Sequence, residues 1–340
     1  METNRRLNVQ EALDLLKGSP FELGELAYGL RSKKHSNKAY YTVNAAITYS
    51  NTCEALCPIC SFARREGQQG AYVLSVEEVS NRARRFSELG AKEIHIIGGI
   101  YSKLDLNYYL DVIRAVRAAD KNFNIVAYTV SECVLMSKIS SLKLDRVFEL
   151  LIEAGVNALP GGGAEIFDES VRKKIAPRKL SGQEWLDAMQ TAHKAGLRTN
   201  ATMLYGHIET PEQVVDHLFK LRDLQDKTGG FKAFVPLPFR QGKSSIQAHS
   251  SATYDLKICA LARLVLDNFD HIRVPITHFD DRLEQVLLWF GADDVGGTHW
   301  NEEVAVSAGA SLLNRDAKKI EDTIRAAGFV PQLTNSNYDI

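Results

Sequence analysis

Cysteine is scarce in this sequence, and its distribution argues against a disulfide framework. Five cysteines occur among 340 residues. An odd number in a long chain is not expected to hold the fold together by pairing. Residues 1–7 (METNRRL) lack the apolar segment of a secretory signal, and no run approaches the roughly 18 apolar residues that a membrane-spanning helix needs. We therefore expect a cytoplasmic, reducing location and no membrane partner.

Net charge is also nearly absent. Lys and Arg total 41 against 42 Asp and Glu, which gives no bulk electrostatic attraction to nucleic acid or to an anionic membrane. Apolar residues make up 45% of the chain and charged residues 24%. These values are typical of a globular protein with a substantial core. We therefore expect no nucleic acid partner.

Short apolar or β-branched runs alternate with helical patterns from residue 45 onward. The runs lie at residues 45–50, 93–97, 124–129, 156–159, 199–205, 232–237 and 272–276, with a weaker one at 292–295. The helical patterns between them include 75–89, 108–119, 144–154 and 211–225. Such alternation predicts parallel strands joined by right-handed crossovers. We predict an α/β fold, a TIM-type (β/α)8 barrel, with a partial barrel of six units as the alternative.

No low-complexity linker divides the chain, so we predict one catalytic domain with helical additions. Residues 1–40 are predicted to form an N-terminal helical extension, 41–310 the barrel, and 311–340 a C-terminal helix and tail packed on the same domain. Active sites of such barrels lie at the carboxyl ends of the strands. The unusual segments of this chain follow predicted strands, so we expect one site at that rim.

Cys53, Cys57 and Cys60 lie close enough in sequence to bind one soft metal centre. Three thiolates gathered in this way most often hold an iron–sulfur cluster. A zinc site would need a fourth ligand, and the next histidine, His95, and the next cysteine, Cys133, are far along the chain. The spacing favours a cluster with one open iron. Zinc with a distant ligand, or no metal, are the alternatives.

A Cys-x3-Cys-x2-Cys loop after the first strand of a βα repeat resembles the hallmark loop of the radical S-adenosylmethionine superfamily. The resemblance implies one [4Fe–4S] cluster held by the three cysteines, whose open iron chelates the amino and carboxylate groups of S-adenosylmethionine. One electron then cleaves a C–S bond and releases a 5′-deoxyadenosyl radical. An electron donor such as flavodoxin or ferredoxin is the implied partner. Ile59 stands at a position that is usually aromatic in this superfamily.

The same resemblance implies roles for residues outside the cysteines. Gly98 and Gly99 match the superfamily's glycine pair, whose backbone approaches the methionine amino group closely; a simple turn is the alternative. Glu165 is placed to accept hydrogen bonds from the ribose hydroxyls, and the alternative is a solvated acid at a helix N-terminus. Phe62 is the candidate for stacking on adenine, with a place in the core as its alternative.

Two longer segments narrow the resemblance. Residues 159–168 (LPGGGAEIFD) and 199–210 (TNATMLYGHIET) closely resemble the aminofutalosine synthase family of the futalosine route to menaquinone, and residues 228–237 and 291–294 fit the same group. This implies a transferase in which the adenosyl radical adds to the enol-ether double bond of 3-[(1-carboxyvinyl)oxy]benzoate. Rearrangement and decarboxylation then give 6-amino-6-deoxyfutalosine and methionine. S-adenosylmethionine is in that case a consumed co-substrate.

A dicarboxylate substrate needs polar or cationic groups to bind it. Tyr205, His207 and Arg282 are our candidates for substrate binding, all in segments predicted to lie at the rim. Arg172 and Arg240 also fall in such segments, although surface arginines are the commoner case.

Two other functions remain open. One is a sister radical enzyme: the dehypoxanthine futalosine cyclase of the same pathway, or the enzyme that joins tyrosine to a ribityl-uracil in deazaflavin synthesis. Both begin by hydrogen abstraction, and Phe167, Asp168 and Asn200 favour the synthase over them. The other is a non-catalytic iron–sulfur or zinc protein that uses the barrel as a binding module. The catalytic interpretation predicts that the three cysteines lie at one cluster site, with Gly98 and Glu165 facing it.

Overall fold

Seven parallel strands in sequence order form the main sheet of the protein. The computed structural model describes residues 6–275, 277–310 and 315–339. Within these residues the strand order is β2-β3-β4-β5-β6-β7-β8, and every neighbouring pair is parallel. The strands are β2 (Asn44–Ser50), β3 (Glu93–Gly98), β4 (Asn124–Ala127), β5 (Ala158–Leu159), β6 (Arg198–Tyr205), β7 (Phe231–Pro238) and β8 (His271–Ile272). Each overlaps an apolar run of the sequence, so the predicted α/β repeat is confirmed.

A second sheet, of three strands among the described residues, connects the ends of the first. Its order is β10-β1-β9, with β1 (Lys38–Thr42), β9 (Asp294–Gly297) and β10 (Val330–Leu333). β1 leads almost directly into β2. An Arg273–Asp294 bridge links β8 to β9, and an Ala45–Trp300 bridge links β2 to the segment after β9. These contacts join the last strand of the main sheet to the first, as in the predicted (β/α)8 barrel. β1 and β10 were not predicted.

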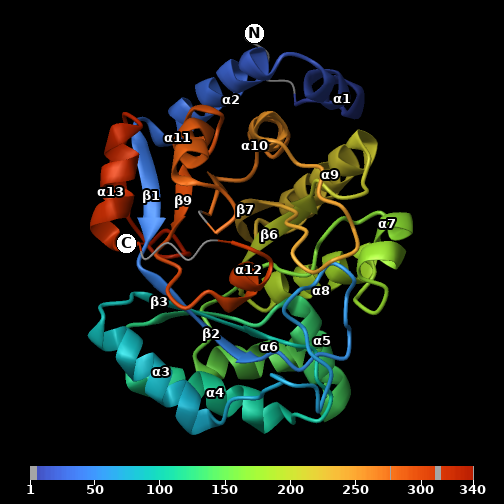
Figure 1. Cartoon of the computed structure of the whole chain (residues 1–340), viewed down its shortest axis with the longest axis vertical. Helices are drawn as coiled ribbons and strands as arrows, with labels where there is room; N and C mark the ends of the chain where they lie inside the picture. The colour runs from blue at the N-terminus through green and yellow to red at the C-terminus, as the bar shows by residue number, and fades with distance from the viewer. Residues whose placement is uncertain (1–5, 276, 311–314, 340) are drawn as a thin grey trace.

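Helices cover the outside of the barrel, with α2, α10 and α11 together at one end of the view and α3 and α4 at the other (Figure 1). The described helices are α1 (Val9–Lys17), α2 (Pro20–His35), α3 (Val76–Glu88), α4 (Leu106–Ala119), α5 (Val130–Ser140), α6 (Leu144–Ala154), α7 (Glu169–Ile175), α8 (Gly182–Lys194), α9 (Pro211–Thr228), α10 (Ala252–Val265), α11 (Asp281–Trp289), α12 (Glu303–Ser307) and α13 (Ala317–Ala326). In this part of the chain, no helix has both the length and the apolar character that crossing a membrane requires.

The two faces of the barrel strands differ in chemistry. Ile47, Ile96 and Met203 are fully buried in the apolar layer between the strands and the outer helices. Side chains alternate between the two faces of a strand, so the neighbouring residues Thr48 and His95 point to the inside of the barrel. The outer faces of the strands therefore pack against the helices, and their inner faces carry polar groups.

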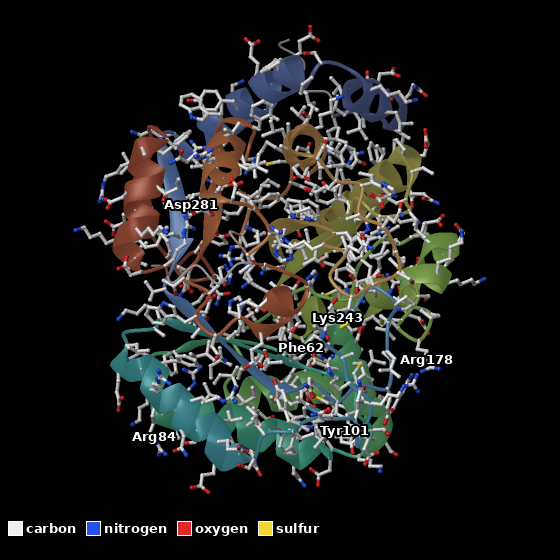
Figure 2. All side chains as sticks on the ribbon, in the orientation of Figure 1. Phe62, Arg84, Tyr101, Arg178, Lys243 and Asp281 are labelled. Atoms are coloured by element: carbon white, nitrogen blue, oxygen red, sulfur yellow. The ribbon has the colours of Figure 1, made fainter. Side chains whose placement is uncertain are left out.

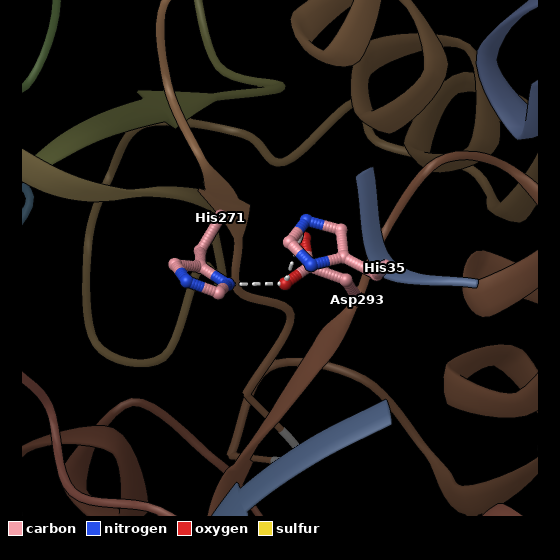
Figure 3. Close-up of side chains that lie close together, drawn as sticks. All are labelled: His35, His271 and Asp293. Carbon is pink, nitrogen blue, oxygen red and sulfur yellow. Dashed lines mark hydrogen bonds and ion pairs between the residues drawn. The ribbon is translucent and has the colours of Figure 1, made fainter. Parts of the chain in front are cut away.

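A buried charged cluster ties the end of α2 to β8 and β9 (Figure 3). Asp293 is fully buried and accepts hydrogen bonds from Arg263 and from His271 Nδ1, the latter at 2.6 Å. His35 Nε2 lies 3.6 Å from the same carboxylate and 2.8 Å from the backbone oxygen of Asp270. His35, His271 and Asp293 bring three metal-binding atoms within 4.8 Å of one another. Arg263 already balances the charge of Asp293. We therefore interpret His35, His271 and Asp293, which we call the His35 clamp, as a group that stabilises the fold.

The C-terminal tail lies at the amino ends of the strands, opposite to the cysteine loop. The backbone N–H of Ser336 donates to Glu93 Oε2 at 2.6 Å, and its hydroxyl donates to Oε1. Tyr338 donates to Asp294 at 2.5 Å, and its ring stacks on His271 with centroids 3.4 Å apart. Glu93, Asp294 and His271 each begin a strand. The tail therefore binds the polar groups at the amino end of the barrel.

Candidate active site

The three cysteines lie on one loop after β2, at the carboxyl end of the barrel. Cys53 is half-buried, Cys57 buried and Cys60 exposed. The backbone N–H of Ile100 donates to Cys53 Sγ at 3.4 Å, and that of Cys60 donates to the carbonyl of Cys57 at 2.9 Å. Burial raises the pKa of Cys57 to about 11, while the ammonium group of Lys179 acts in the opposite direction. The thiols therefore lie beside the half-buried ammonium group of Lys179.

The three cysteine sulfurs lie near one another, but not all within 4.8 Å. Cys53 and Cys60 both raise the pKa of Cys57, so the three thiols share one neighbourhood. In the described residues, the His35 clamp is the one group with three metal-binding atoms within 4.8 Å of one another. The cysteine sulfurs are therefore spread more widely than that. A zinc ion with Zn–S bonds of about 2.3 Å would hold its sulfurs about 3.8 Å apart, whereas a four-iron cluster binds each thiolate on a different iron.

Gly98 and Gly99 lie against the start of the cysteine loop. A Cβ on Gly98 would lie 2.4 Å from the ring of Tyr49. A Cβ on Gly99 would lie 2.0 Å from the backbone oxygen of Thr52 and 2.9 Å from Cβ of Cys53. Packing within the protein therefore requires glycine at both positions, whichever ligand binds, and it sets the Gly99 peptide beside Cys53.

Glu165 reaches the cysteine loop through an ion pair. It follows β5 in the left-handed conformation, with φ of 47°. Lys179 Nζ donates to its Oε1 at 2.7 Å. Burial alone would raise the pKa of Glu165, but Lys179 outweighs burial and holds this pKa below its ordinary value. Burial opposes the charge of Lys179 too, but Glu165 and the thiols of Cys57 and Cys60 raise its pKa. Glu165 thus lies near the cysteines, as predicted, with a partner that the sequence did not indicate.

Two arginines shape the loops around this pair. Arg172 in α7 is 2% exposed and donates to the backbone oxygens of Gly163 (3.3 Å) and Ile166 (3.1 Å), which folds the glycine loop after β5. Arg178 donates to the backbone oxygen of Glu54 at 3.1 Å and so connects this region to the cysteine loop. Its side chain is exposed at the edge of the molecule (Figure 2). Nε, Nη1 and Nη2 of Arg172 all donate to backbone oxygens, so Arg172 is a structural residue and does not bind a substrate carboxylate.

Phe62 lies on the same loop as the cysteines and is half-buried (Figure 2). Its ring meets that of Tyr72 edge-on, with centroids 6.5 Å apart. The neighbouring Ser61 accepts a hydrogen bond from the backbone N–H of Lys243 at 2.9 Å. The loop after β7 therefore meets the cysteine loop at Phe62. Stacking of this ring on adenine stays a prediction.

Tyr205, His207 and Arg282 do not come together as a substrate site. Tyr205 is fully buried between β6 and α10, where its hydroxyl donates to Asp255 at 2.9 Å. The side chain of His207 has no exposed area; its Nδ1 lies 2.9 Å from Glu209, and its Nε2 lies 3.0 Å from a backbone oxygen. These positions do not support substrate binding by Tyr205 or His207. Arg282 is exposed on the first turn of α11, and its role stays a prediction.

Two residues beside the site were not predicted from the sequence, the half-buried Lys179 and the fully buried Glu132. Lys179 lies in the connection between α7 and α8, where no motif marks it. Glu132 is fully buried in the first turn of α5 and accepts the Gly98 N–H at 3.1 Å. A signal for Glu132 did exist, because Thr129 and Glu132 form a capping-box pattern directly after a predicted strand.

Comparison with known proteins agrees with this site. The model of the radical SAM superfamily matches residues 47–221, and the model of the CofH/MqnC C-terminal region matches residues 228–340. The aminodeoxyfutalosine synthase of Thermus thermophilus is 39% identical over 96% of this chain and 90% of its own. The 5-amino-6-(D-ribitylamino)uracil–L-tyrosine 4-hydroxyphenyl transferase of Archaeoglobus fulgidus is 34% identical over 100% of this chain and 99% of its own.

Solved structures share the fold. Methylornithine synthase superposes with a TM-score of 0.75 at 18% identity, over 97% of this chain and 95% of its own. The FeFe-hydrogenase maturase HydG from Carboxydothermus hydrogenoformans gives a TM-score of 0.77 at 19% identity, over 98% of this chain and 78% of its own. Radical SAM enzymes use a [4Fe–4S] cluster and S-adenosylmethionine, and the three thiols beside the Gly99 peptide fit that pair of cofactors. The chain belongs to the radical SAM superfamily of enzymes.

Proposed function

We propose that this chain is an aminofutalosine synthase, which joins the adenosyl group of S-adenosylmethionine to 3-[(1-carboxyvinyl)oxy]benzoate. The products are 6-amino-6-deoxyfutalosine, methionine and the lost carboxylate as carbon dioxide. One observation carries the proposal: the two segments that resemble this family pack against each other beside the cysteines. A Cβ on Gly161 would lie 2.2 Å from the backbone oxygen of Asn200, and the Leu204 N–H donates to the backbone oxygen of Glu165 at 2.9 Å.

The residues of the chain bind and orient the cofactors in this proposal. When bound, the cluster supplies the electron that cleaves S-adenosylmethionine to methionine and a 5′-deoxyadenosyl radical. Cys53, Cys57 and Cys60 hold the cluster. Lys179 donates to Oε1 of Glu165, which leaves Oε2 to accept hydrogen bonds from the ribose hydroxyls. The same ammonium offsets the negative charge of the thiolates, so the ion pair fixes the nucleoside relative to the cluster.

Arg240 is the rim arginine that we assign to a substrate carboxylate, in preference to Arg282. It follows β7, and its Nη2 donates to the backbone oxygen of His278 at 2.8 Å. Its Nε is buried and has no hydrogen-bond partner in the described part of the chain. A guanidinium held by one bond, with donors left over, suits a carboxylate.

The second candidate is the 4-hydroxyphenyl transferase reaction named for the Archaeoglobus fulgidus relative. The 34% identity over the whole chain favours it. By its name, that enzyme acts on tyrosine and 5-amino-6-(D-ribitylamino)uracil in place of the benzoate. The cluster, Glu165 and Lys179 would serve both reactions, so the substrate distinguishes the two candidates.

Mass spectrometry of the anaerobically reconstituted protein tests the proposal. The protein is given reductant, S-adenosylmethionine and either 3-[(1-carboxyvinyl)oxy]benzoate or tyrosine with the ribityl-uracil. A product that carries the adenosyl group joined to the benzoate, less one carboxylate, supports the synthase. Turnover of the second pair alone supports the transferase. Cys57→Ala should abolish either product, and Cys259→Ala, a buried cysteine of α10, should keep it.

A further inference from the structure

Glu132 is a buried carboxylate that is surrounded by donors and has no cationic partner in the part of the chain that the structure describes. Its Oε1 accepts the Tyr49 hydroxyl at 2.7 Å and the Gly98 N–H at 3.1 Å. Its Oε2 accepts the backbone N–H and the hydroxyl of Thr129, both at 2.7 Å. The residue has no exposed area. The buried ion pairs of the described residues involve other acids. Burial raises the pKa of Glu132 to about 7, and the hydrogen bonds from Thr129, Tyr49 and Gly98 oppose that rise because they favour the ionised carboxylate.

The two carboxylate oxygens of Glu132 accept hydrogen bonds from different parts of the chain. Oε2 completes the capping box at the start of α5, and a helix cap needs nothing more. In α3, for comparison, Glu78 Oε2 accepts the Ser75 N–H at 2.7 Å, and its side chain is exposed. Oε1 of Glu132 instead reaches across to β2 and β3. Capping therefore explains only half of the interactions of this buried acid.

Oε1 bonds to the part of the chain that lies against the cluster loop. The Gly99 N–H donates to the backbone oxygen of Ser50 at 2.9 Å, and the next N–H, that of Ile100, donates to Cys53 Sγ at 3.4 Å. The carbonyl between them, that of Gly99, lies in the same stretch of backbone. Its position beside the first cysteine is fixed by Gly98 and Gly99, where no side chain fits.

The hydroxyl of Tyr49 lies between two acceptors and can donate only one hydrogen bond. Its oxygen lies 2.7 Å from Glu132 Oε1 but 3.4 Å from the carbonyl oxygen of Gly99. A charged acceptor at the shorter distance takes the proton. The Gly99 carbonyl is thereby left without a strong donor, next to the first cysteine. The ionised form of Glu132, which pairs with no cation among the described residues, also makes this point attractive to a cation.

We propose that Glu132 is a positioning residue for S-adenosylmethionine: by accepting the Tyr49 hydroxyl and the Gly98 N–H, it keeps the Gly99 carbonyl open to the ammonium group of the ligand. Glu132 is fully buried and acts through Tyr49 and Gly98 without touching the ligand. The inference rests on the use of S-adenosylmethionine at the three cysteines. It does not depend on which second substrate the enzyme takes.

Replacement of Glu132 by glutamine tests this role through ligand binding. The amide can keep its oxygen on Thr129, but its NH2 group then faces Tyr49 and Gly98, and the Tyr49 hydroxyl turns to the Gly99 carbonyl. We expect the Kd of S-adenosylmethionine for the reconstituted holoprotein, measured by equilibrium dialysis, to rise about tenfold, the effect of one hydrogen bond to a charged group. Iron and sulfide contents should stay at the parent values. Glu78→Gln, the matched capping-box variant, should bind with the parent Kd.

The double variant Glu132→Gln/Tyr49→Phe separates positioning from a merely structural role. Removing the hydroxyl removes the group that competes for the Gly99 carbonyl, so the double variant should recover most of the affinity that Glu132→Gln loses. A purely structural role predicts that the two changes add. If Glu132→Gln does not retain its cluster, Glu132→Asp replaces it in the same pair of measurements, with the same expected loss and recovery.

Three results would overturn the inference. They are a Kd for Glu132→Gln within about twofold of the parent, a double variant that binds no better than the single one, and a parent holoprotein that binds no S-adenosylmethionine. Failure to form aminofutalosine, with the affinity pattern intact, would refute the proposed substrate and leave the role of Glu132 standing. The two proposals therefore fail in different measurements.

Discussion

Replacing Gly99 by alanine should remove the cluster before it unfolds the protein. The new Cβ would lie 2.0 Å from the backbone oxygen of Thr52, 2.7 Å from its carbonyl carbon and 2.9 Å from Cβ of Cys53. Non-bonded carbon contacts are normally about 3.5 to 4.0 Å, so the strand and the loop must separate by more than about 1 Å. Backbone atoms cannot rotate away as the end of a side chain can. The loop that carries Cys53 therefore has to move.

The size of the effect differs between the fold and the metal site. Overpacking of this kind costs about 1 to 3 kcal/mol, which lowers the Tm of a chain of this length by about 1 to 4 °C. Metal–ligand distances, by contrast, tolerate deviations of only about 0.2 Å. A displacement of Cys53 by about 1 Å is thus minor for the barrel and severe for the cluster. We expect iron and sulfide contents to fall below about half of the parent values.

The assay is anaerobic reconstitution followed by iron and sulfide analysis and a thermal melt. Gly29→Ala is the matched control, because a Cβ at this position in α2 would meet nothing within 4 Å. It should keep the cluster and gain about 0.5 to 1 kcal/mol from helix propensity. A Gly99→Ala protein with the iron content, sulfide content and Tm of the parent would show that the loop accommodates the new Cβ without displacing Cys53, contrary to our prediction.

Three further predictions concern single side chains. Lys179→Met should leave the fold intact and raise the Kd of S-adenosylmethionine about tenfold or more, measured by equilibrium dialysis, because Glu165 loses the partner that orients it; an unchanged Kd would exclude this role. Burial lowers the pKa of His217 to about 3. Its stabilising contribution is therefore complete above the unfolded-state pKa of about 6.5 and is lost as the pH falls below it, by about 1.4 kcal/mol per pH unit. Urea unfolding between pH 6.5 and 4.5 should show a weaker pH dependence in His217→Gln, and equal slopes would contradict the assignment. Asp293→Asn should destabilise the protein by about 3 to 5 kcal/mol in the same assay, because it leaves the fully buried Arg263 without its anion. A loss below about 1 kcal/mol would show that the His35 clamp contributes little to the free energy of unfolding.

The strands were predictable because their signal is local. The alternation of faces in a run such as 199–205 and the capping residues before helices are written in consecutive residues. β1 and β10 escaped prediction because β1 pairs with β10 and with β9, both of which lie at the other end of the chain. Nothing in residues 38–42 alone distinguishes a strand from the end of the preceding helical region.

The site was predicted only in part, for a related reason. Tyr205 ends β6 and His207 lies just after it, in a distinctive motif that suggested substrate binding. Their polar atoms instead bond to Asp255 and Glu209. Whether a residue of a strand end faces the inside of the barrel or the helices depends on the packing of that strand, and a motif does not reveal it.

The sequence by itself determined the barrel and the three cysteines that we propose as cluster ligands. Hydrophobic period and cysteine spacing are properties of neighbouring residues, and neighbours in the chain stay neighbours in the fold. Tertiary structure decided which groups surround the ligands: Lys179 as the partner of Glu165, and Glu132 beneath Gly98. Glu132 and Gly98 come from different βα units, and Lys179 and Glu165 lie at opposite ends of α7 within one unit. Neither contact is between neighbours in the sequence, so only the folded barrel brings these groups together.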